Sequence, residues 1–273
     1  MFGNFIEYHI TDRCNINCKS CLHFCPLSND VKDKNIFEIK YDFLLLKPLE
    51  NTFNELHLLG GEPFLHKELI EICKYVRKLF PNKSIIIITN GTVLPSEDNI
   101  KIFRKLDIKI QISIYPFRKD WKEYYQKYIN TIQDIITNTD DINTLNEDNI
   151  TFFVRPCINY KQDYTDEQIE QCRMRYCTQL NDGKLYLCPN CAYFKYFDNY
   201  FQGQHNIQNT YQNNIDYYDL TENISEETFY NWIYKSKPTL CYYCKECNRW
   251  SNYNAELEKW ERSKRDINEW LEY

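Results

Sequence analysis

The first chemically distinctive feature of the chain is a short run that contains three cysteines. Cys14, Cys18 and Cys21 follow directly on a strand-like run at residues 5–11. Cysteine thiolates hold iron–sulfur clusters, and a [4Fe–4S] cluster with three protein ligands keeps one iron open for another molecule. Zinc also favours Cys and His at short spacings, and Cys25 or His23 would then be a fourth ligand. The triplet alone therefore leaves a reactive cluster and a structural zinc site open.

A second motif follows the next strand-like run, at residues 55–59. It reads Gly60-Gly61-Glu62-Pro63, and glycine lets a backbone approach a ligand closely and adopt positive φ. The spacing C-x-x-x-C-x-x-C followed by Gly-Gly-Glu-Pro resembles the radical S-adenosylmethionine (SAM) superfamily. Because two independent motifs occur in the expected order, the resemblance favours the cluster over zinc.

The resemblance implies two cofactors, a [4Fe–4S] cluster on the cysteine triplet and SAM on its open iron. In the superfamily, one electron from the cluster splits SAM to a 5′-deoxyadenosyl radical, which takes a hydrogen atom from the substrate. The motif Gly60 to Pro63 would then bind SAM, with the glycine peptide groups and Glu62 on its amino group. Where the family usually has an aromatic residue before the third cysteine, this chain has Ser20, and Phe24 is a candidate for the adenine contact.

The elements around these motifs predict an α/β fold. Short β-branched or aromatic runs alternate with helical patterns, which is typical of βα units around a parallel sheet. We expect strands at 5–11, 54–59, 84–89, 108–114 and 150–155, and helices near 40–52, 66–80, 97–106 and 120–138. The resemblance makes this a partial (β/α)6 TIM-like barrel over residues 1–160, although a sixth strand is not evident in the sequence.

Chemistry in βα folds gathers at the carboxyl ends of the strands. Asn90 follows the third expected strand, Ser113 ends the fourth and Arg155 ends the fifth. The resemblance gives Ser113 and Arg155 contacts to the ribose hydroxyls and the carboxylate of SAM, and places Asn90 in the same site. The alternatives are a strand-end serine, a surface arginine and an ordinary Asn-Gly turn.

A second group of cysteines follows residue 160, where the alternating pattern stops. Its members are Cys172, Cys177, Cys188, Cys191, Cys241, Cys244 and Cys247. A G-x-x-x-x-C hairpin that ends at Cys188, with a later C-x-x-C pair, resembles the twitch extension of radical SAM enzymes. This is a shortened SPASM extension that carries an auxiliary [4Fe–4S] cluster, and we expect it at residues 161–251 as a small, cysteine-rich α+β unit.

The resemblance assigns four cluster ligands, Cys177, Cys188, Cys241 and Cys244, and leaves three others in reserve, Cys172, Cys191 and Cys247. Seven thiols suffice for one complete cluster but not for two. A structural zinc ion is the alternative, since paired C-x-x-C motifs are a common zinc framework. The remaining residues, 252–273, predict an amphipathic helix with Leu257, Trp260, Ile267, Trp270 and Leu271 near one face.

Composition restricts the partners. The 273 residues have a formal net charge of -6 without a basic run, so nucleic acid is not expected. We find neither a signal peptide nor an apolar run of the ~20 residues that a membrane span needs. The protein is therefore expected in the cytoplasm, with its thirteen cysteines reduced and largely engaged in binding metal.

The leading hypothesis is a radical SAM enzyme that takes hydrogen from a small polar substrate, such as a sugar, an aminocyclitol or a nucleotide-linked compound. Oxidation or epimerisation would follow with help from the auxiliary cluster, and flavodoxin or ferredoxin would be the reductant. Peptide maturation by thioether formation, epimerisation or crosslinking is the runner-up, because no leader-binding domain precedes the barrel. A non-catalytic zinc or iron–sulfur protein is the alternative of another class. Tyr115, Asn90 and Arg175 are candidates for contact with the substrate, and the oligomeric state stays open.

Overall fold

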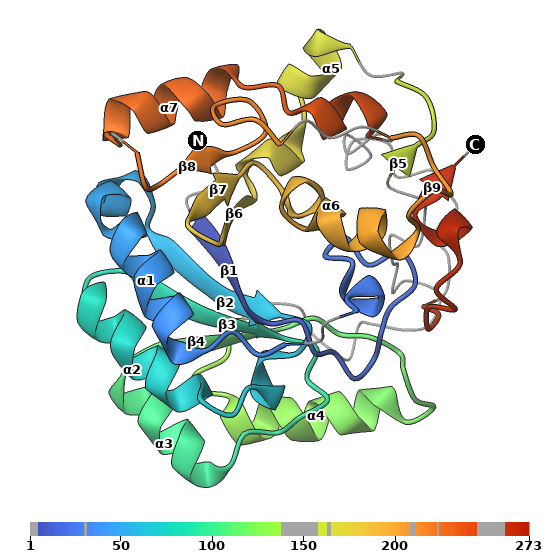
Figure 1. The fold of residues 1–273 in the computed structure, drawn as a ribbon. Helices are drawn as coiled ribbons and strands as arrows, with labels where there is room; N and C mark the ends of the chain where they lie inside the picture. The colour runs from blue at the N-terminus through green and yellow to red at the C-terminus, as the bar shows by residue number, and fades with distance from the viewer. Residues whose placement is uncertain are drawn as a thin grey trace.

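The computed structural model describes residues 5–29, 32–137, 158–162, 165–207, 211–222, 224–244 and 260–272. Its main sheet has seven strands in the order β4-β3-β2-β1-β6-β7-β8 (Figure 1). Four parallel strands form one half of it: β1 (Phe5–Thr11), β2 (Glu55–Gly60), β3 (Ser84–Thr89) and β4 (Ile108–Ile112). Because these strands are parallel, their carboxyl ends lie at one edge of the sheet.

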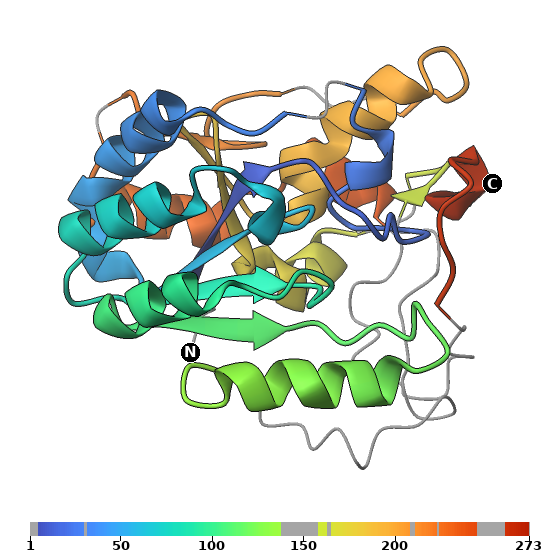
Figure 2. The same cartoon turned by 90° about the horizontal axis from the view of Figure 1, so that it is seen from below.

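A helix follows each of these strands and packs on the outer face of the sheet (Figures 1 and 2). The four are α1 (Ile36–Leu46), α2 (Leu69–Leu79), α3 (Glu97–Lys105) and α4 (Trp121–Ile132). Apolar side chains from strands and helices meet in a continuous core that includes Leu58, Ile87, Phe43 and Phe103. Burial of this apolar surface is the main term that holds the helices on the sheet.

Local capping moves one helix from its expected place. The side chain of Asn35 accepts hydrogen bonds from the backbone N–H groups of Phe37 and Glu38, and Glu38 completes a capping box. This cap starts α1 before the expected residue 40. After Leu46 the chain tightens into the 3₁₀ helix η2 (Lys47–Thr52), where a proline stands near the start.

The second half of the main sheet comes from residues after 160. Strand β6 (Thr178–Asn181) pairs with β1 in parallel, and β7 (Lys184–Tyr186) and β8 (Tyr218–Asp219) continue the sheet in antiparallel order. Gly183 turns the chain between β6 and β7 with a φ of 70°. Helix α6 (Pro189–Tyr200) lies on the side of the sheet away from α1 to α3 (Figure 1).

Smaller elements complete the described chain. They are α5 (Asp166–Glu170), α7 (Glu226–Lys235), the two-stranded sheet of β5 (Ile158–Asn159) and β9 (Leu271–Glu272), and the 3₁₀ helices η1 (Cys25–Leu27), η3 (Pro63–Leu65), η5 (Arg173–Tyr176), η6 (Thr239–Tyr243) and η8 (Ile267–Glu269). A second apolar core joins η1 to α6 and β9 through Phe24, Phe197 and Trp270. Residues close to both ends of the chain therefore share one core.

The helix expected over residues 252–273 is wrong for the described part, residues 260–272. That part contains only η8 and β9. Arg265 has a φ of 59°, which interrupts a right-handed helix. The backbone N–H of Ser263 donates to the backbone carbonyl of Asn17, far away along the chain, and not to a carbonyl in the preceding turn of a helix. Tertiary hydrogen bonds thus replace the helical ones, although Trp270 and Leu271 are buried as an apolar stripe requires.

The predicted α/β fold class is confirmed, with a mainly parallel sheet of the partial TIM-like type. Four expected strands and four expected helices are present close to their predicted places, while the strand expected at 150–155 lies outside the described residues. The pairing of β6 with β1 was not expected from the sequence. No helix of the described chain is long and apolar enough to cross a membrane.

Candidate functional site

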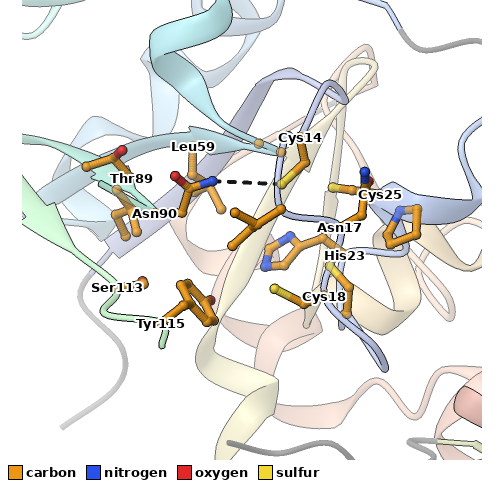
Figure 3. A pocket seen from close by; sticks show the side chains of 16 residues that line it. Cys14, Asn17, Cys18, His23, Cys25, Leu59, Thr89, Asn90, Ser113 and Tyr115 are labelled. Atoms are coloured by element: carbon orange, nitrogen blue, oxygen red, sulfur yellow. Dashed lines mark hydrogen bonds between the residues drawn. The ribbon is translucent and has the colours of Figure 1, made fainter. Parts of the chain in front are cut away.

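The first cysteine loop lines a cavity of about 130 Å³ at the carboxyl ends of the parallel strands (Figure 3). The structure brings together in this cavity most of the predicted site residues: Cys14, Cys18, Cys21, Gly60, Gly61, Asn90 and Ser113. Tyr115 also lines it, whereas Phe24 is buried in the second core and Arg155 lies outside the described residues.

The two glycines are needed because β2 ends against the start of the cysteine loop. The backbone N–H of Gly61 donates to Thr11 at 2.8 Å. A Cβ atom on Gly61 would lie 2.8 Å from the Cβ atom of Cys14 and would overlap the carbonyl oxygen of Arg13. Gly60 has a φ of 154°, and a Cβ atom on it would overlap the carbonyl oxygen of Thr11. Only glycine allows this approach, which holds the thiols beside the end of β2.

Glu62 does not line the cavity, although the resemblance gave it a SAM contact. Its fully buried carboxylate accepts hydrogen bonds from the backbone N–H groups of Phe64 and Asn90 and from the hydroxyl of Thr89. Burial raises the pKa of Glu62 to about 7, against the lowering effect of these donors. The side chain therefore joins the ends of β2 and β3, and Pro63 begins η3.

The three thiols of the first loop differ in acidity. Burial raises the pKa of Cys14, and it raises the pKa of Cys18 much further. A hydrogen bond with the thiol of Cys25 lowers the pKa of Cys21 to about 7. Metal ligands must be deprotonated, so the positive charge of bound iron would have to overcome the cost of burial at Cys14 and Cys18.

The two residues that would complete a zinc site also line the cavity. Cys25 shares a hydrogen bond with Cys21. His23 faces His9, with 2.6 Å between His23 Nδ1 and His9 Nε2, and burial lowers the pKa of His23 to about 3. Local geometry alone thus does not separate a zinc site from a cluster.

The second cysteine group lines two small adjoining cavities. Cys188, Cys241 and Cys244 line both, Cys172 lines the larger and Cys191 the smaller. The Sγ atoms of Cys188 and Cys191 are 3.6 Å apart. Five cysteines from three separate parts of the chain therefore line these two cavities.

Cys177 lines neither cavity. Its thiol donates to the carboxylate of Glu7 at 3.3 Å, beside the side chain of Gln179. Of the four predicted ligands, Cys188, Cys241 and Cys244 line these cavities, and Cys172, one of the reserve ligands, lines the larger cavity with them. Cys247 lies outside the described residues.

The thiol of Cys188 lies close to several hydrogen-bond donors at the start of α6. Cys188 is the N-cap of α6, and Pro189 occupies the first turn, where a missing N–H costs little. A hydrogen bond from the Cys191 thiol and the backbone N–H groups of Asn190 and Cys191 lower the pKa of Cys188. The start of this helix therefore favours a thiolate at Cys188.

A buried arginine lies beside the larger of these two cavities. Arg175 is 4% exposed, and only apolar atoms of its side chain line that cavity. The terminal nitrogens of its guanidinium donate only to backbone carbonyls, those of Ile169, Ile233, Tyr234 and Ser236. Its Nε atom finds no hydrogen-bond partner among the described residues. A buried charge of this kind is costly unless a charge of opposite sign lies close by.

The sequence profile of the Radical SAM superfamily matches residues 8–163, more than half of the chain. The chain belongs to the radical SAM superfamily. The family brings a [4Fe–4S] cluster and SAM as cofactors, and the three thiols and the glycine cradle at the first cavity fit them.

Curated relatives match only part of this radical SAM protein. The GTP 3′,8-cyclase of Sulfurovum sp. (strain NBC37-1) is 28% identical over 34% of this chain and 28% of its own length. That of Clostridium acetobutylicum is 29% identical over 43% of this chain and 36% of its own length. The chain thus spans about a third of the relatives that it matches.

A solved structure supports the same fold. The crystal structure of BtrN in complex with AdoMet and 2-DOIA aligns with a TM-score of 0.51 and 16% identity. The alignment covers 90% of this chain and 94% of BtrN. At this identity the likeness concerns the fold alone.

The sequence does not reveal one residue beside the thiols of this radical SAM protein. Trp260 donates its indole N–H to Cys18 Sγ at 3.1 Å, whereas the sequence shows it only as part of an apolar stripe. Cys172, one of the reserve ligands, lines the larger cavity of the second group. The only sequence signal for Cys172 is its presence in the second cysteine group, because its neighbours in space are distant along the chain.

Proposed function

We propose that this radical SAM enzyme takes a hydrogen atom from a small polar substrate and completes an oxidation or epimerisation with an auxiliary [4Fe–4S] cluster. The substrate class is a sugar, an aminocyclitol or a nucleotide-linked compound. The single observation that carries the two-cluster part is that five cysteines from three parts of the chain line the two adjoining cavities of the second site. Family membership argues against the non-catalytic alternative.

The residues of the first cavity hold and orient the cofactors. Cys14, Cys18 and Cys21 ligate the first cluster, while the peptide groups of Gly60 and Gly61 approach SAM. When bound, the cluster and SAM together supply a 5′-deoxyadenosyl radical. Asn90 and Ser113 offer polar groups from the ends of β3 and β4, on the walls of the same cavity.

The residues of the second site fit a fully ligated auxiliary cluster. We assign its ligands as Cys172, Cys188, Cys241 and Cys244, which share the larger cavity with Arg175. Four thiolates bring net negative charge, and the guanidinium would balance part of it. Cys191 is the remaining thiol close enough to replace one of them. Zinc bound by four thiolates would carry negative charge as well, so metal analysis has to separate the two.

Two relationships support the substrate class. BtrN, which shares the fold, is described as a complex with AdoMet and 2-DOIA, and we extend the preference for a small molecule from BtrN to this chain. The curated relatives are named for a reaction of GTP, which agrees with a nucleotide-linked substrate. Peptide maturation remains the second class to be tested by the same assay with peptide substrates.

Anaerobic reconstitution tests the proposal. We expect about eight irons and eight sulfides per chain, because two [4Fe–4S] clusters are assigned. With SAM and a reductant, either dithionite or a flavodoxin system, we expect release of 5′-deoxyadenosine. A Cys14→Ala variant is the control for cleavage at the first cluster. Bound zinc at the second site would overturn the auxiliary cluster, and iron at the first site without nucleoside release would overturn the radical mechanism.

A further inference from the structure

The C-terminal segment, residues 260–270, lies along the first cysteine loop. The backbone N–H of Lys19 donates to Glu261 at 2.9 Å, and that of Ser263 donates to Asn17 at 2.8 Å. Cys18 and Arg262 form an antiparallel bridge pair. In Figures 1 and 2 the C-terminal part, in red, lies on the same side of the molecule as the blue loop after β1. The loop is thus paired along its length with residues more than two hundred positions away.

Side chains strengthen this pairing at the third cysteine. Ser20 is 2% exposed, and its hydroxyl donates to the backbone carbonyl of Glu269. The indole N–H of Trp270 donates to the carbonyl of Cys21 at 3.0 Å. Ser20 stands where the superfamily usually has an aromatic side chain, and a small side chain leaves room for the C-terminal backbone to approach. The departure from the family pattern therefore coincides with the docking of this segment.

The closest link to the cluster site is Trp260. Its indole N–H donates to Cys18 Sγ at 3.1 Å, a sulfur that ligates the first cluster. Hydrogen bonds to cluster sulfurs are one of the factors that set the reduction potential of an iron–sulfur cluster. Reduction adds negative charge, which such a donor stabilises, so the bond favours the reduced cluster.

We propose that the C-terminal segment is a working part of the first cluster site. Its backbone holds the cysteine loop in place, and the indole of Trp260 donates to Cys18 and raises the reduction potential of the cluster. Trp260 is thus a positioning and tuning residue, not a catalytic one. The proposal depends on the cofactor of the family, and on neither the substrate class nor the auxiliary cluster.

A redox titration followed by electron paramagnetic resonance tests this role without substrate. A Cys188→Ala, Cys241→Ala background removes any signal from the second site. In that background we compare Trp260→Phe with Trp270→Phe, since both keep an aromatic ring but only the first removes a donor to sulfur. For Trp260→Phe we expect the ratio of reduced to oxidised cluster to fall about tenfold at a given potential, a lower midpoint by about 59 mV. Trp270→Phe should leave the midpoint unchanged.

An unchanged midpoint in Trp260→Phe with full iron content overturns the proposal, and so does an equal shift in Trp270→Phe. If Trp260→Phe cannot hold iron, Trp260→His, which keeps a ring N–H, takes its place. Iron retained by Trp260→His at the original midpoint supports the donor role, and loss of iron or a lowered midpoint overturns it. Release of 5′-deoxyadenosine by the parent protein is measured separately, so failure of the proposed function is recognised independently.

Discussion

The two cysteine sites are built in different ways. The first takes its three thiols from one loop after β1. The second is lined by five cysteines, which come from the segment before β6, the start of α6 and the region of η6. A short loop brings ligands together through local spacing, whereas three distant segments converge only when the sheet and α6 have packed. The first site is therefore readable in the sequence and the second only in part.

The buried charges beside the two sites also differ. Glu62, near the first cavity, bonds only to neutral N–H and O–H donors, and Arg175, in the second, bonds only to carbonyls. The two groups predict different responses. The carboxyl group of Glu62 should make the stability of the fold depend on pH, and the positive charge of Arg175 should make a cluster in the second site easier to reduce.

Removal of one thiol from each site should give the largest difference in activity between the two sites. We expect Cys18→Ala to abolish release of 5′-deoxyadenosine from SAM, because the first cluster loses one of its three ligands. Cys188→Ala should keep uncoupled SAM cleavage but lose product. The measurement is chromatography of 5′-deoxyadenosine and product after anaerobic turnover. Full turnover in Cys188→Ala would contradict a role for the second site.

A comparison of Cys172 with Cys177 tests which of them is a ligand in the second site. Cys172→Ala should lose about four irons per chain, because this thiol lines the cavity of the other ligands. Cys177→Ala is the matched control and should keep its iron, because Cys177 bonds to Glu7 instead. Iron and sulfide analysis after reconstitution decides between them. Loss of iron in Cys177→Ala alone would restore the ligand set expected from the sequence.

The pH response of the first region should be intermediate in size. The pKa of Glu62 rises from an ordinary value of 4.5 to about 7 in the folded protein, because the carboxyl group is buried. The neutral form thus stabilises the fold fully below about pH 4.5, and this contribution is lost as the pH rises to about 7, a difference of roughly 3 kcal/mol. Glu62→Gln removes the titration and should flatten this dependence.

Denaturant unfolding of the reconstituted protein between pH 5 and pH 8, on both sides of the pKa of about 7, measures this effect. The comparison uses the change in unfolding free energy with pH, since Glu62→Gln also leaves one backbone donor less well paired. Parallel curves for the parent and the variant would show that Glu62 stays ionised in the fold.

The cation of the second site should have the smallest of these effects. Arg175→Gln removes a positive charge beside the cavity of the proposed ligands, so we expect reduction to become harder, by about tenfold in the ratio of reduced to oxidised cluster. Arg77→Gln is the matched control, because Arg77 also donates to backbone carbonyls but lies on α2. Redox titration in a Cys14→Ala background reports the second site. Equal midpoints in both variants would rule out the role of Arg175.

Local pattern predicted most of the parallel half of the fold. Strands from Phe5 to Ile112 and the helices between them follow from apolar periodicity and from caps such as Asn35. The pattern did not reveal β6, whose four residues are too few to show a period. It gave a helix where residues 260–272 instead bond to the cysteine loop. Predictions failed where partners distant along the chain decide the conformation.

By itself, the sequence determined the radical SAM motifs, their order and their place at strand ends, because the spacing of thiols on a loop and of glycines after a strand is local. Only the tertiary structure decided that Cys172 shares a cavity with Cys188, Cys241 and Cys244, that Arg175 lies beside that cavity, and that Trp260 reaches Cys18. These choices depend on which distant segments pack together, and hydrophobic burial is not directional. A pattern of residue types therefore says that a segment is buried but not which sulfur it will meet.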